Sequence, residues 1–538
     1  MSTRVSNEIR RLLGAIVTCA ALAAGLAACG GGGDSEGIPS ASGGTPTGTG
    51  TGTPTDAGTG SPTGADPSSP TGGGTGTGTA SGTGGNGTGS VPTPPGGTAP
   101  GSGPMKLFVE STWRTSNSRV AVDSNGGKHV AFYYYEPNIE QRPTAAAYRY
   151  CATRCDDPAS WKEIQLGSHA RSVQLKLTPA GKPRLLIGAD SAVYVGGRDY
   201  FYATCDADCT QAGAWAMTRI FSGRVPASNL DNDDELPQRG FALDPQGRPR
   251  FVVFDENQLA APEHFGLFYL SCDVRCDQPA AWSETLITLA TRYEVERVAQ
   301  PALSFSQDGK PRIATAQFFP VGSRPAVLMY LACDDACNRT ASWGRAELMP
   351  RGSGSEPSVD IAVDGNGRPR IAFYQEALLE GRGKRLFYLA CDDACLDPAR
   401  WQGVDVGLGV FNGQEPDLEL DALGRPRIAY ADWEKGGIGF AWCNQDCVGA
   451  SGNWQHRIVE DRDALYQAWP VAYPAHCTGG LWNTLTPTLA LPPSGPAQIA
   501  IDATYHARCL YDHNPSDNVP PSSEMNLITR AFRLVTVE

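Results

Sequence analysis

The sequence is short of basic residues and has no long apolar run. Its 44 lysines and arginines are outnumbered by 57 aspartates and glutamates, giving a net charge of −13 at pH 7. A protein this acidic repels phosphate groups, which argues against nucleic acid as a partner. The apolar run from Leu12 to Leu26 is too short to span a bilayer as a helix.

The motifs that mark many enzymes are also missing. Residues 105–538 contain no G-x-S-x-G nucleophile motif and no cofactor fingerprint, and the seven histidines show no H-x-H or H-E-x-x-H spacing. We therefore expect no cofactor and no metal. The missing motifs also favour a protein that is not an enzyme. An enzyme whose site is assembled from scattered loops would leave no motif, so that alternative stays open.

The N-terminus is typical of an exported protein. Arg4, Arg10 and Arg11 precede the apolar run, which ends at Leu26-Ala27-Ala28-Cys29-Gly30. This string resembles the lipobox of bacterial lipoproteins. The resemblance implies that residues 1–28 are a signal peptide, that Cys29 is lipidated, and that the membrane is a partner through this anchor. With no Asp after Cys29, it also implies location at the outer membrane.

Residues 29–104 have the composition of a tether. After Cys29 the segment is dominated by Gly, Thr, Ser, Pro and Ala and has no Lys or Arg. Such a segment cannot bury enough apolar surface to offset the entropy lost on ordering. We expect a disordered linker that holds residues 105–538, the folded part, away from the membrane.

The cysteines indicate an oxidising compartment, because sixteen would be unusual in a cytosolic protein. Twelve form six Cys-x3-Cys pairs, and disulfides closing small turns are favoured over zinc, which needs four ligands brought together. Cys477 and Cys509 remain and are predicted to bond to each other. The predicted pairs are Cys151 with Cys155, Cys205 with Cys209, Cys272 with Cys276, Cys333 with Cys337, Cys391 with Cys395, Cys443 with Cys447, and Cys477 with Cys509.

Seven internal repeats give the strongest signal in the chain. Each has a Gly turn between two stretches of alternating apolar residues, which is the pattern of a β-hairpin. A third apolar stretch leads into a Cys-x3-Cys turn in six of the copies, and a Trp follows at the start of a fourth. The repeats begin DSNGGKHVAF at Asp123, TPAGKPRLLI at Thr178, DPQGRPRFVV at Asp244, SQDGKPRIAT at Ser306, DGNGRPRIAF at Asp364, DALGRPRIAY at Asp421 and PPSGPAQIAI at Pro492.

Four strands per repeat and no convincing helix predict an all-β fold, a seven-bladed β-propeller of four-stranded blades over residues 105–538. The seventh copy has three strands, and the segment from Lys106 aligns with a fourth strand, so the N-terminal strand is expected to close the ring. The D-x-x-G-x-P-R-I-A-Y repeats resemble sialidase-like propeller repeats. That resemblance implies a fold and not a function, and the complete sialidase Asp-box is absent.

Residues that recur in every blade are expected to be structural, and residues that depart from the repeat mark the candidate site. The departures lie in two long segments, residues 460–486 and 502–525. We predict a ligand-binding or adhesion module for a polysaccharide or a protein, with a hydrolase or lyase, or a scaffold subunit, as alternatives. The candidate site residues are Tyr466, Trp469, Tyr473, His476, Trp482, His506, Asp512, His513 and Asp432.

Overall fold

The computed structural model describes most of the predicted folded part. The described residues are 105–107, 114–135, 145–191, 197–224, 239–256, 265–289, 297–318, 327–350, 358–377, 383–409, 412–471, 475, 477–484, 486–511 and 522–537. The predicted signal peptide, the lipidated Cys29 and the tether to residue 104 lie outside them. No helix among the described residues is long and apolar enough to cross a membrane.

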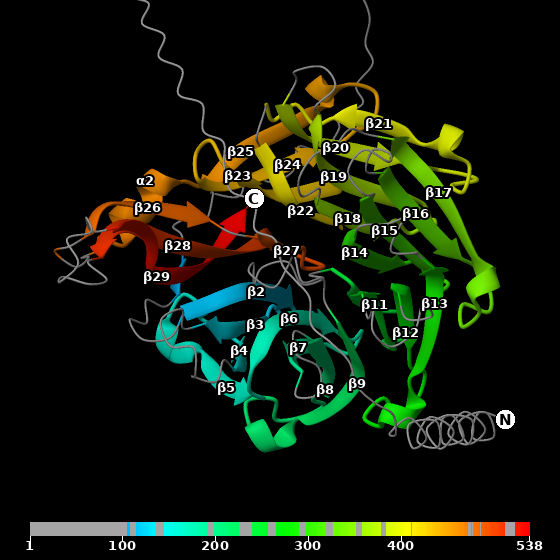
Figure 1. Cartoon of the computed structure of the whole chain (residues 1–538), viewed down its shortest axis with the longest axis horizontal. Helices are drawn as coiled ribbons and strands as arrows, with labels where there is room; N and C mark the ends of the chain where they lie inside the picture. The colour runs from blue at the N-terminus through cyan, green and yellow to red at the C-terminus, as the bar shows by residue number, and fades with distance from the viewer. Residues whose placement is uncertain are drawn as a thin grey trace, which may run out of the picture. The chain divides into compact units, whose positions relative to one another are not determined.

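These residues form seven antiparallel sheets that follow one another in chain order (Figure 1). Six of the sheets have four strands, paired in order of sequence. They are β2 (Arg114–Val122), β3 (Lys128–Tyr135), β4 (Ala146–Cys151) and β5 (Lys162–Leu166); β6 (Ala170–Leu177), β7 (Pro183–Asp190), β8 (Gly197–Thr204) and β9 (Ala216–Arg224); β10 (Phe241–Leu243), β11 (Pro249–Glu256), β12 (Phe265–Ser271) and β13 (Ser283–Leu289); β14 (Arg297–Phe305), β15 (Pro311–Phe318), β16 (Val327–Cys333) and β17 (Trp343–Pro350); β18 (Ser358–Val363), β19 (Pro369–Ala377), β20 (Gly383–Ala390) and β21 (Gln402–Asp405); and β22 (Asn412–Leu420), β23 (Pro426–Asp432), β24 (Gly437–Cys443) and β25 (Trp454–Glu460).

The Gly turn of each repeat joins the first two strands of its sheet. In the fifth sheet, Asp364 accepts hydrogen bonds from the backbone N–H groups of Asn366 and Arg368 at 2.9 and 3.0 Å. Gly367 has a φ of +79°, which a residue with a side chain rarely adopts. Ile361 then pairs with Ile371 across β18 and β19, as the predicted hairpin requires.

The seventh sheet contains both ends of the folded part. Its strands are β27 (Thr488–Ala490), β28 (Ala497–Tyr511), β29 (Ser522–Val537), β1 (Met105–Leu107) and β26 (Cys477–Thr484). Strand β1 pairs with β29, with Met105 opposite Leu534. Strand β26 pairs with the far half of β28, beyond the part that pairs with β27.

Two features of this region differ from the sequence prediction. Much of the segment predicted as a loop, residues 502–525, is a long hairpin of β28 and β29. A helix, α2 (Arg462–Ala468), follows β25, although no helix was expected. Asp461 caps it by accepting a hydrogen bond from the N–H of Ala464 at 2.8 Å. A seven-residue helix with one buried side chain, Leu465, leaves little periodic signal in a sequence.

The core of the protein is divided among the spaces between sheets. Each pair of consecutive sheets shares a cluster of buried apolar side chains, and one more cluster joins the seventh sheet to the first. In that last cluster Val130 of β3 packs with Phe532 and Leu534 of β29. Every sheet is therefore stabilised mainly by its two neighbours.

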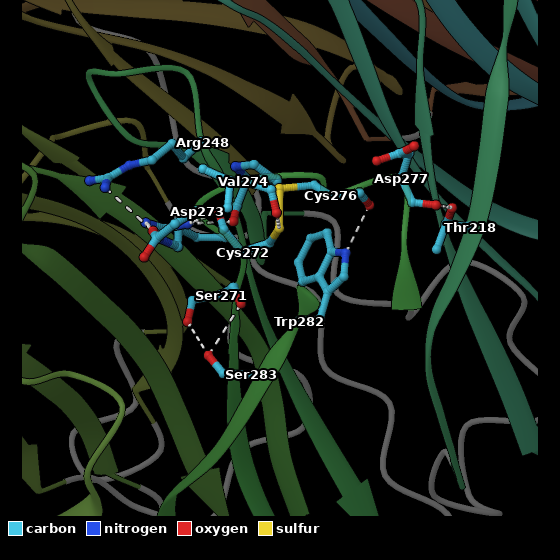
Figure 2. The surroundings of a disulfide bond; sticks show 12 residues. Thr218, Arg248, Ser271, Cys272, Asp273, Val274, Cys276, Asp277, Trp282 and Ser283 are labelled. Carbon is cyan, nitrogen blue, oxygen red and sulfur yellow. Dashed lines mark hydrogen bonds and ion pairs between the residues drawn. A yellow bond between two sulfur atoms is a disulfide. The ribbon is translucent and has the colours of Figure 1, made fainter. Parts of the chain in front are cut away.

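The Cys-x3-Cys turns are disulfide-bonded and nearly identical, and each carries a short 3-10 helix. Figure 2 shows the third turn, where Trp282 donates a hydrogen bond from Nε1 to the carbonyl of Cys276 at 3.0 Å. The hydroxyl of Thr218, in the preceding sheet, donates to the carbonyl of Asp277. The six 3-10 helices are Pro158–Ser160, Ala212–Ala214, Pro279–Ala281, Thr340–Ser342, Pro398–Arg400 and Ser451–Asn453.

The repeated arginines are structural, as the sequence pattern indicates. Arg370 donates hydrogen bonds to the carbonyl of Cys391 at 2.8 Å and to Asp392 at 2.8 Å, which fixes the disulfide turn to its own sheet. The equivalent residues Arg184, Arg250, Arg312 and Arg427 each donate to the carbonyl of the first cysteine of their own sheet.

Candidate functional site

A cavity of about 490 Å³ is lined by the first strand of every sheet. These strands are β2, β6, β10, β14, β18, β22 and β27, of which Figure 1 labels all but β10 around the centre of the seven sheets. We call this space the inner cavity. Its volume lies in the range of small-ligand sites.

The residues at one repeat position show that the inner cavity breaks the symmetry of the sheets. Four residues before the first residue of each Gly turn, the chain carries Arg119, Gln174, Gly240, Ala302, Asp360, Asp417 and Thr488. Two residues before it stand Ala121, Lys176, Ala242, Ser304, Ala362, Glu419 and Ala490. If the repeated fold alone determined these positions, all seven copies would carry similar residues. The charged side chains are therefore candidates for a functional role.

Arg239 is the centre of the charge in the inner cavity. Its guanidinium Nε lies 3.4 Å from Asp360 and 4.0 Å from Asp417, and its Nη1 lies 3.8 Å from Glu415. Only 9% of its side chain is exposed. Its carbonyl accepts a hydrogen bond from the N–H of Leu303 at 2.9 Å, which holds the residue beside β14. One cation from the residues just before β10 therefore meets three carboxyl groups from the fifth and sixth sheets.

Two of these carboxylates are also held by the backbone. Asp360 accepts from the N–H of Leu418, in the next sheet, at 2.7 Å, and Asp417 accepts from the N–H of Leu489 at 3.0 Å. Gln174 makes the same kind of bond to Phe241 at 2.9 Å. The first strand of a sheet has N–H groups without a strand partner, so this bond has a structural role and also fixes the carboxylates in place.

Glu415 lies in an irregular part of β22. Its φ is +49°, and the register with β23 shifts on both sides of Gln414. A non-glycine residue at such a φ is strained, and β-bulges often re-aim side chains at functional sites. The N–H of Glu415 donates to Ser358 Oγ at 2.9 Å, which keeps the bulge against the fifth sheet.

Burial shifts the protonation of the carboxyls around the cavity. It raises the pKa of Asp360 to about 8, an effect that the Arg239 guanidinium opposes and the Asp417 carboxylate reinforces. Burial likewise raises the pKa of Glu419 to about 7. Carboxyls with a pKa near neutrality can hold or release a proton at physiological pH.

A second cation, Arg119, lies where the first and seventh sheets meet. Its Nη1 donates to Thr488 Oγ1 at 2.7 Å, and the Thr488 hydroxyl donates to the carbonyl of Ser118 at 2.8 Å. Burial and the charge of Arg239 lower the pKa of Arg119 to about 10. This guanidinium remains charged at neutral pH and is oriented by its neighbours.

The structure buries the two tryptophans that stand among the predicted site residues. Trp469 is 5% exposed and Trp482 is 1% exposed, and both pack in a small core with Leu465 and the Cys477–Cys509 disulfide. The guanidinium of Arg533 lies 4.9 Å above the Trp469 ring. These rings are buried because α2 and β26 fold over β28, which the sequence pattern does not reveal.

The other predicted site residues are dispersed or lie outside the described residues. The Tyr466 hydroxyl donates to the carbonyl of Gly480, and His506 lies 3.2 Å from Thr504 Oγ1. Asp432 is buried and accepts from the N–H of Lys435 at 2.8 Å, beside the exposed Trp433. Tyr473, His476, Asp512 and His513 lie outside the described residues.

The residues around the inner cavity were missed because they carry no motif. Position-by-position comparison of the seven repeats would have found them, since the charged residues stand at equivalent places that are small or uncharged in other copies. Within the described part of the chain, no group of three or more His, Cys, Asp or Glu residues is placed to hold a metal ion.

No family model matches the sequence, and no curated protein matches it. Among solved structures, a protein of unknown function from Dyadobacter fermentans is 10% identical with a TM-score of 0.39. The match covers 80% of this chain and 97% of the Dyadobacter chain. An α-L-arabinofuranosidase of Fusarium graminearum is 12% identical with a TM-score of 0.42, covering 61% and 92%. A sialidase of Streptococcus pneumoniae is 10% identical with a TM-score of 0.38, covering 82% and 71%. At these TM-scores the likenesses decide neither fold nor function.

Proposed function

We propose that this chain is an exported binding protein whose ligand enters the inner cavity of a seven-bladed β-propeller. Residue Cys29 anchors it to the outer membrane, residues 30–104 act as the tether, and β1 closes the ring. The succession of seven sheet interfaces, the last of which joins the seventh sheet to the first, supports this architecture. The pairing of β1 with β29 supports the closure.

The chemistry of the cavity favours a small, hydroxyl-rich ligand such as the end of a polysaccharide. Arginine and threonine side chains donate hydrogen bonds, and carboxylates accept them, so a sugar with many hydroxyl groups finds partners of both kinds. The observation that carries the proposal is the position of the Arg239 guanidinium within 4.0 Å of the carboxyl groups of Asp360, Glu415 and Asp417. Asp360 and Asp417 share a repeat position at which four other sheets have the uncharged residues Gln174, Gly240, Ala302 and Thr488.

Calorimetry with soluble oligosaccharides selected on a glycan array tests this site. Asp417→Asn keeps an oxygen for the N–H of Leu489 and removes the charge, so we expect at least about tenfold weaker binding with the fold intact. Asp432→Asn is the matched control, since Asp432 is buried but does not line the cavity. If binding is lost only in the control, the ligand binds at the surface around Asp432 and not in the inner cavity.

A hydrolase or lyase is the second candidate, and the raised pKa values favour it. Burial leaves Asp360 with a pKa of about 8, so this carboxyl holds a proton at neutral pH and could serve as a general acid. Glu415 or Asp417 would then be the second carboxyl group that glycoside hydrolysis requires. The test is turnover of chromogenic glycosides by the natural protein. If Asp360→Asn abolishes turnover and still binds the glycoside, the protein is an enzyme and not only a binding protein.

The anchor is tested separately. Cys29→Ala should release the protein from the membrane fraction into the periplasm or medium, with the same far-UV spectrum and melting curve. Continued membrane attachment of this variant would contradict lipidation at Cys29 and favour attachment through a scaffold partner instead.

A further inference from the structure

Five of the grooves between consecutive sheets hold a repeated aromatic contact. Five of the six Trp residues that follow a disulfide turn pack edge-on against a Tyr in the third strand of the preceding sheet. The ring centroids are 5.0 Å apart for Tyr148 and Trp215, 5.3 Å for Tyr202 and Trp282, 5.1 Å for Tyr269 and Trp343, 5.1 Å for Tyr330 and Trp401, and 5.0 Å for Tyr388 and Trp454. We call this Trp the wedge.

The groove between the sixth and seventh sheets has no wedge among the described residues. Phe440 stands three residues before Cys443, where the other sheets have their Tyr. The seventh sheet has no Cys-x3-Cys turn, because β29 is followed in the sheet by β1. Residues 30–104, which precede β1 in the chain, contain no aromatic residue at all. In the other sheets the wedge stands at the start of the fourth strand. The residues before β1, which is the equivalent strand of the seventh sheet, contain no tryptophan.

A cavity of about 670 Å³ occupies this groove. One wall is Phe440 and Trp442, whose rings stack with centroids 5.6 Å apart at an interplanar angle of 23°. The fourth and fifth sheets carry the small residues Ala332 and Ala390 at the position of Trp442. The opposite wall is the Gly turn of the seventh sheet, which includes Pro493.

The rim of the groove is polar, with two arginines beside side-chain oxygens that accept hydrogen bonds from them. Arg427 donates to Asp421 at 2.7 Å and to Asn444 Oδ1 at 3.0 Å, and Arg425 donates to Asp421 at 2.7 Å. Two guanidiniums against one carboxylate leave the rim with a net positive charge. The turns that carry the wedges elsewhere are acidic, as in Cys-Asp-Asp-Ala-Cys at Cys391. The charges of rim and turn are complementary.

We propose that this groove binds a tryptophan presented on an acidic turn of a partner polypeptide. The basis is internal to the molecule, since five equivalent grooves are filled by this side chain on this kind of turn. A buried aromatic anchor in a preformed pocket is the usual source of affinity at protein interfaces. The groove is distinct from the inner cavity, and its proposed partner is a protein and not a sugar.

A synthetic peptide with the sequence of residues 390–401, closed by its disulfide, is the sharpest probe. Its turn preorganises the tryptophan, because Trp401 donates its indole N–H to the carbonyl of Cys395 at 2.8 Å in the intact protein. Calorimetry with the full mature protein should show saturable binding. The same peptide with Trp401→Ala should bind at least about tenfold more weakly.

Two protein variants locate the binding. Trp442→Ala removes one wall of the groove and should weaken peptide binding at least tenfold, whereas Trp433→Ala, on an exposed turn outside the groove, should leave it unchanged. Melting curves show whether each of these two variants is folded. A third variant, Ser494→Glu at the exposed rim, should also weaken binding, because its carboxylate repels the acidic turn without touching the core.

The proposal fails if the peptides with and without tryptophan bind equally, if neither binds at millimolar concentration, or if Trp433→Ala alone abolishes binding. It also fails if no peptide binds and a neutral oligosaccharide binds with an affinity that Trp442→Ala weakens. The first three outcomes leave the sugar site proposed above untouched, because Trp442 does not line the inner cavity, whereas the last would move sugar binding to this groove.

Discussion

Trp401 of the fifth sheet meets Tyr330 of the fourth edge-on, with ring centroids 5.1 Å apart at an interplanar angle of 65°. This contact joins consecutive sheets through side chains alone. Its geometry is preferred by aromatic pairs and adds to the stabilisation from buried area. The same relationship recurs between five pairs of sheets, so it is a main source of cohesion in the fold.

Replacing Trp401 by Ala should therefore destabilise the protein by about 3 to 5 kcal/mol, the usual cost of truncating a large core aromatic residue. Urea denaturation followed by circular dichroism measures this change. Trp433→Ala is the control, because Trp433 is 66% exposed. We expect that control to stay within about 0.5 kcal/mol of the natural protein.

The seven disulfides should not contribute equally. The Cys-x3-Cys pairs are separated by 4 residues and Cys477–Cys509 by 32. In the loop-entropy model these correspond to about 2 and about 4 kcal/mol. Replacing Cys477 and Cys509 together by Ala should therefore lower the unfolding midpoint more than replacing Cys391 and Cys395. Non-reducing mass mapping should find all seven bonds, and free thiols in the short turns would contradict the oxidising compartment.

The sequence could predict what is repeated but not what the chain adds to the repeats. The all-β sheets, the Gly hairpins and the disulfide pairing follow from local patterns that occur many times. The burial of Trp469 and Trp482 follows from α2 and β26 folding over the end of β28, a long-range packing event without a local signature. The sequence pattern therefore predicts ligand contacts for two tryptophans that in fact form a core.

The burial of Trp469 determines what its replacement should do. Because Trp469 is buried and lies under the Arg533 guanidinium, Trp469→Ala should lower the melting temperature clearly and should not act as a clean binding variant. Differential scanning calorimetry of this variant beside His506→Ala, whose side chain is only partly buried, separates packing from ligand contact.

The N-terminal strand and the tether should respond differently to deletion. Removing residues 105–112 takes away β1, which pairs with β29 from Met105 to Leu107, and leaves the edge of β29 without a partner. The whole folded part should then melt earlier and aggregate more readily. Deleting residues 31–100 should leave melting unchanged, and equal behaviour of the two truncations would contradict closure by β1.

The pH dependence of stability follows from Asp360. Its folded pKa of about 8 lies above the ordinary value near 4 for an unfolded aspartate, so the folded state retains a proton that the unfolded state loses. This contribution to stability is complete below about pH 4 and is lost as the pH rises towards 8, by at most about 1.4 kcal/mol per pH unit for one proton. Glu419, with a pKa of about 7, acts in the same direction.

Asp360→Asn removes this titration and keeps an oxygen that can accept from the N–H of Leu418. Urea denaturation at pH 4.5, 6, 7 and 8.5 should show the natural protein losing stability with rising pH more steeply than the variant. Asp393→Asn, at an exposed carboxylate, should follow the natural protein. Parallel curves for Asp360→Asn and the natural protein would mean that Asp360 is ionised throughout, held by Arg239 at 3.4 Å, and the general-acid role would then be lost.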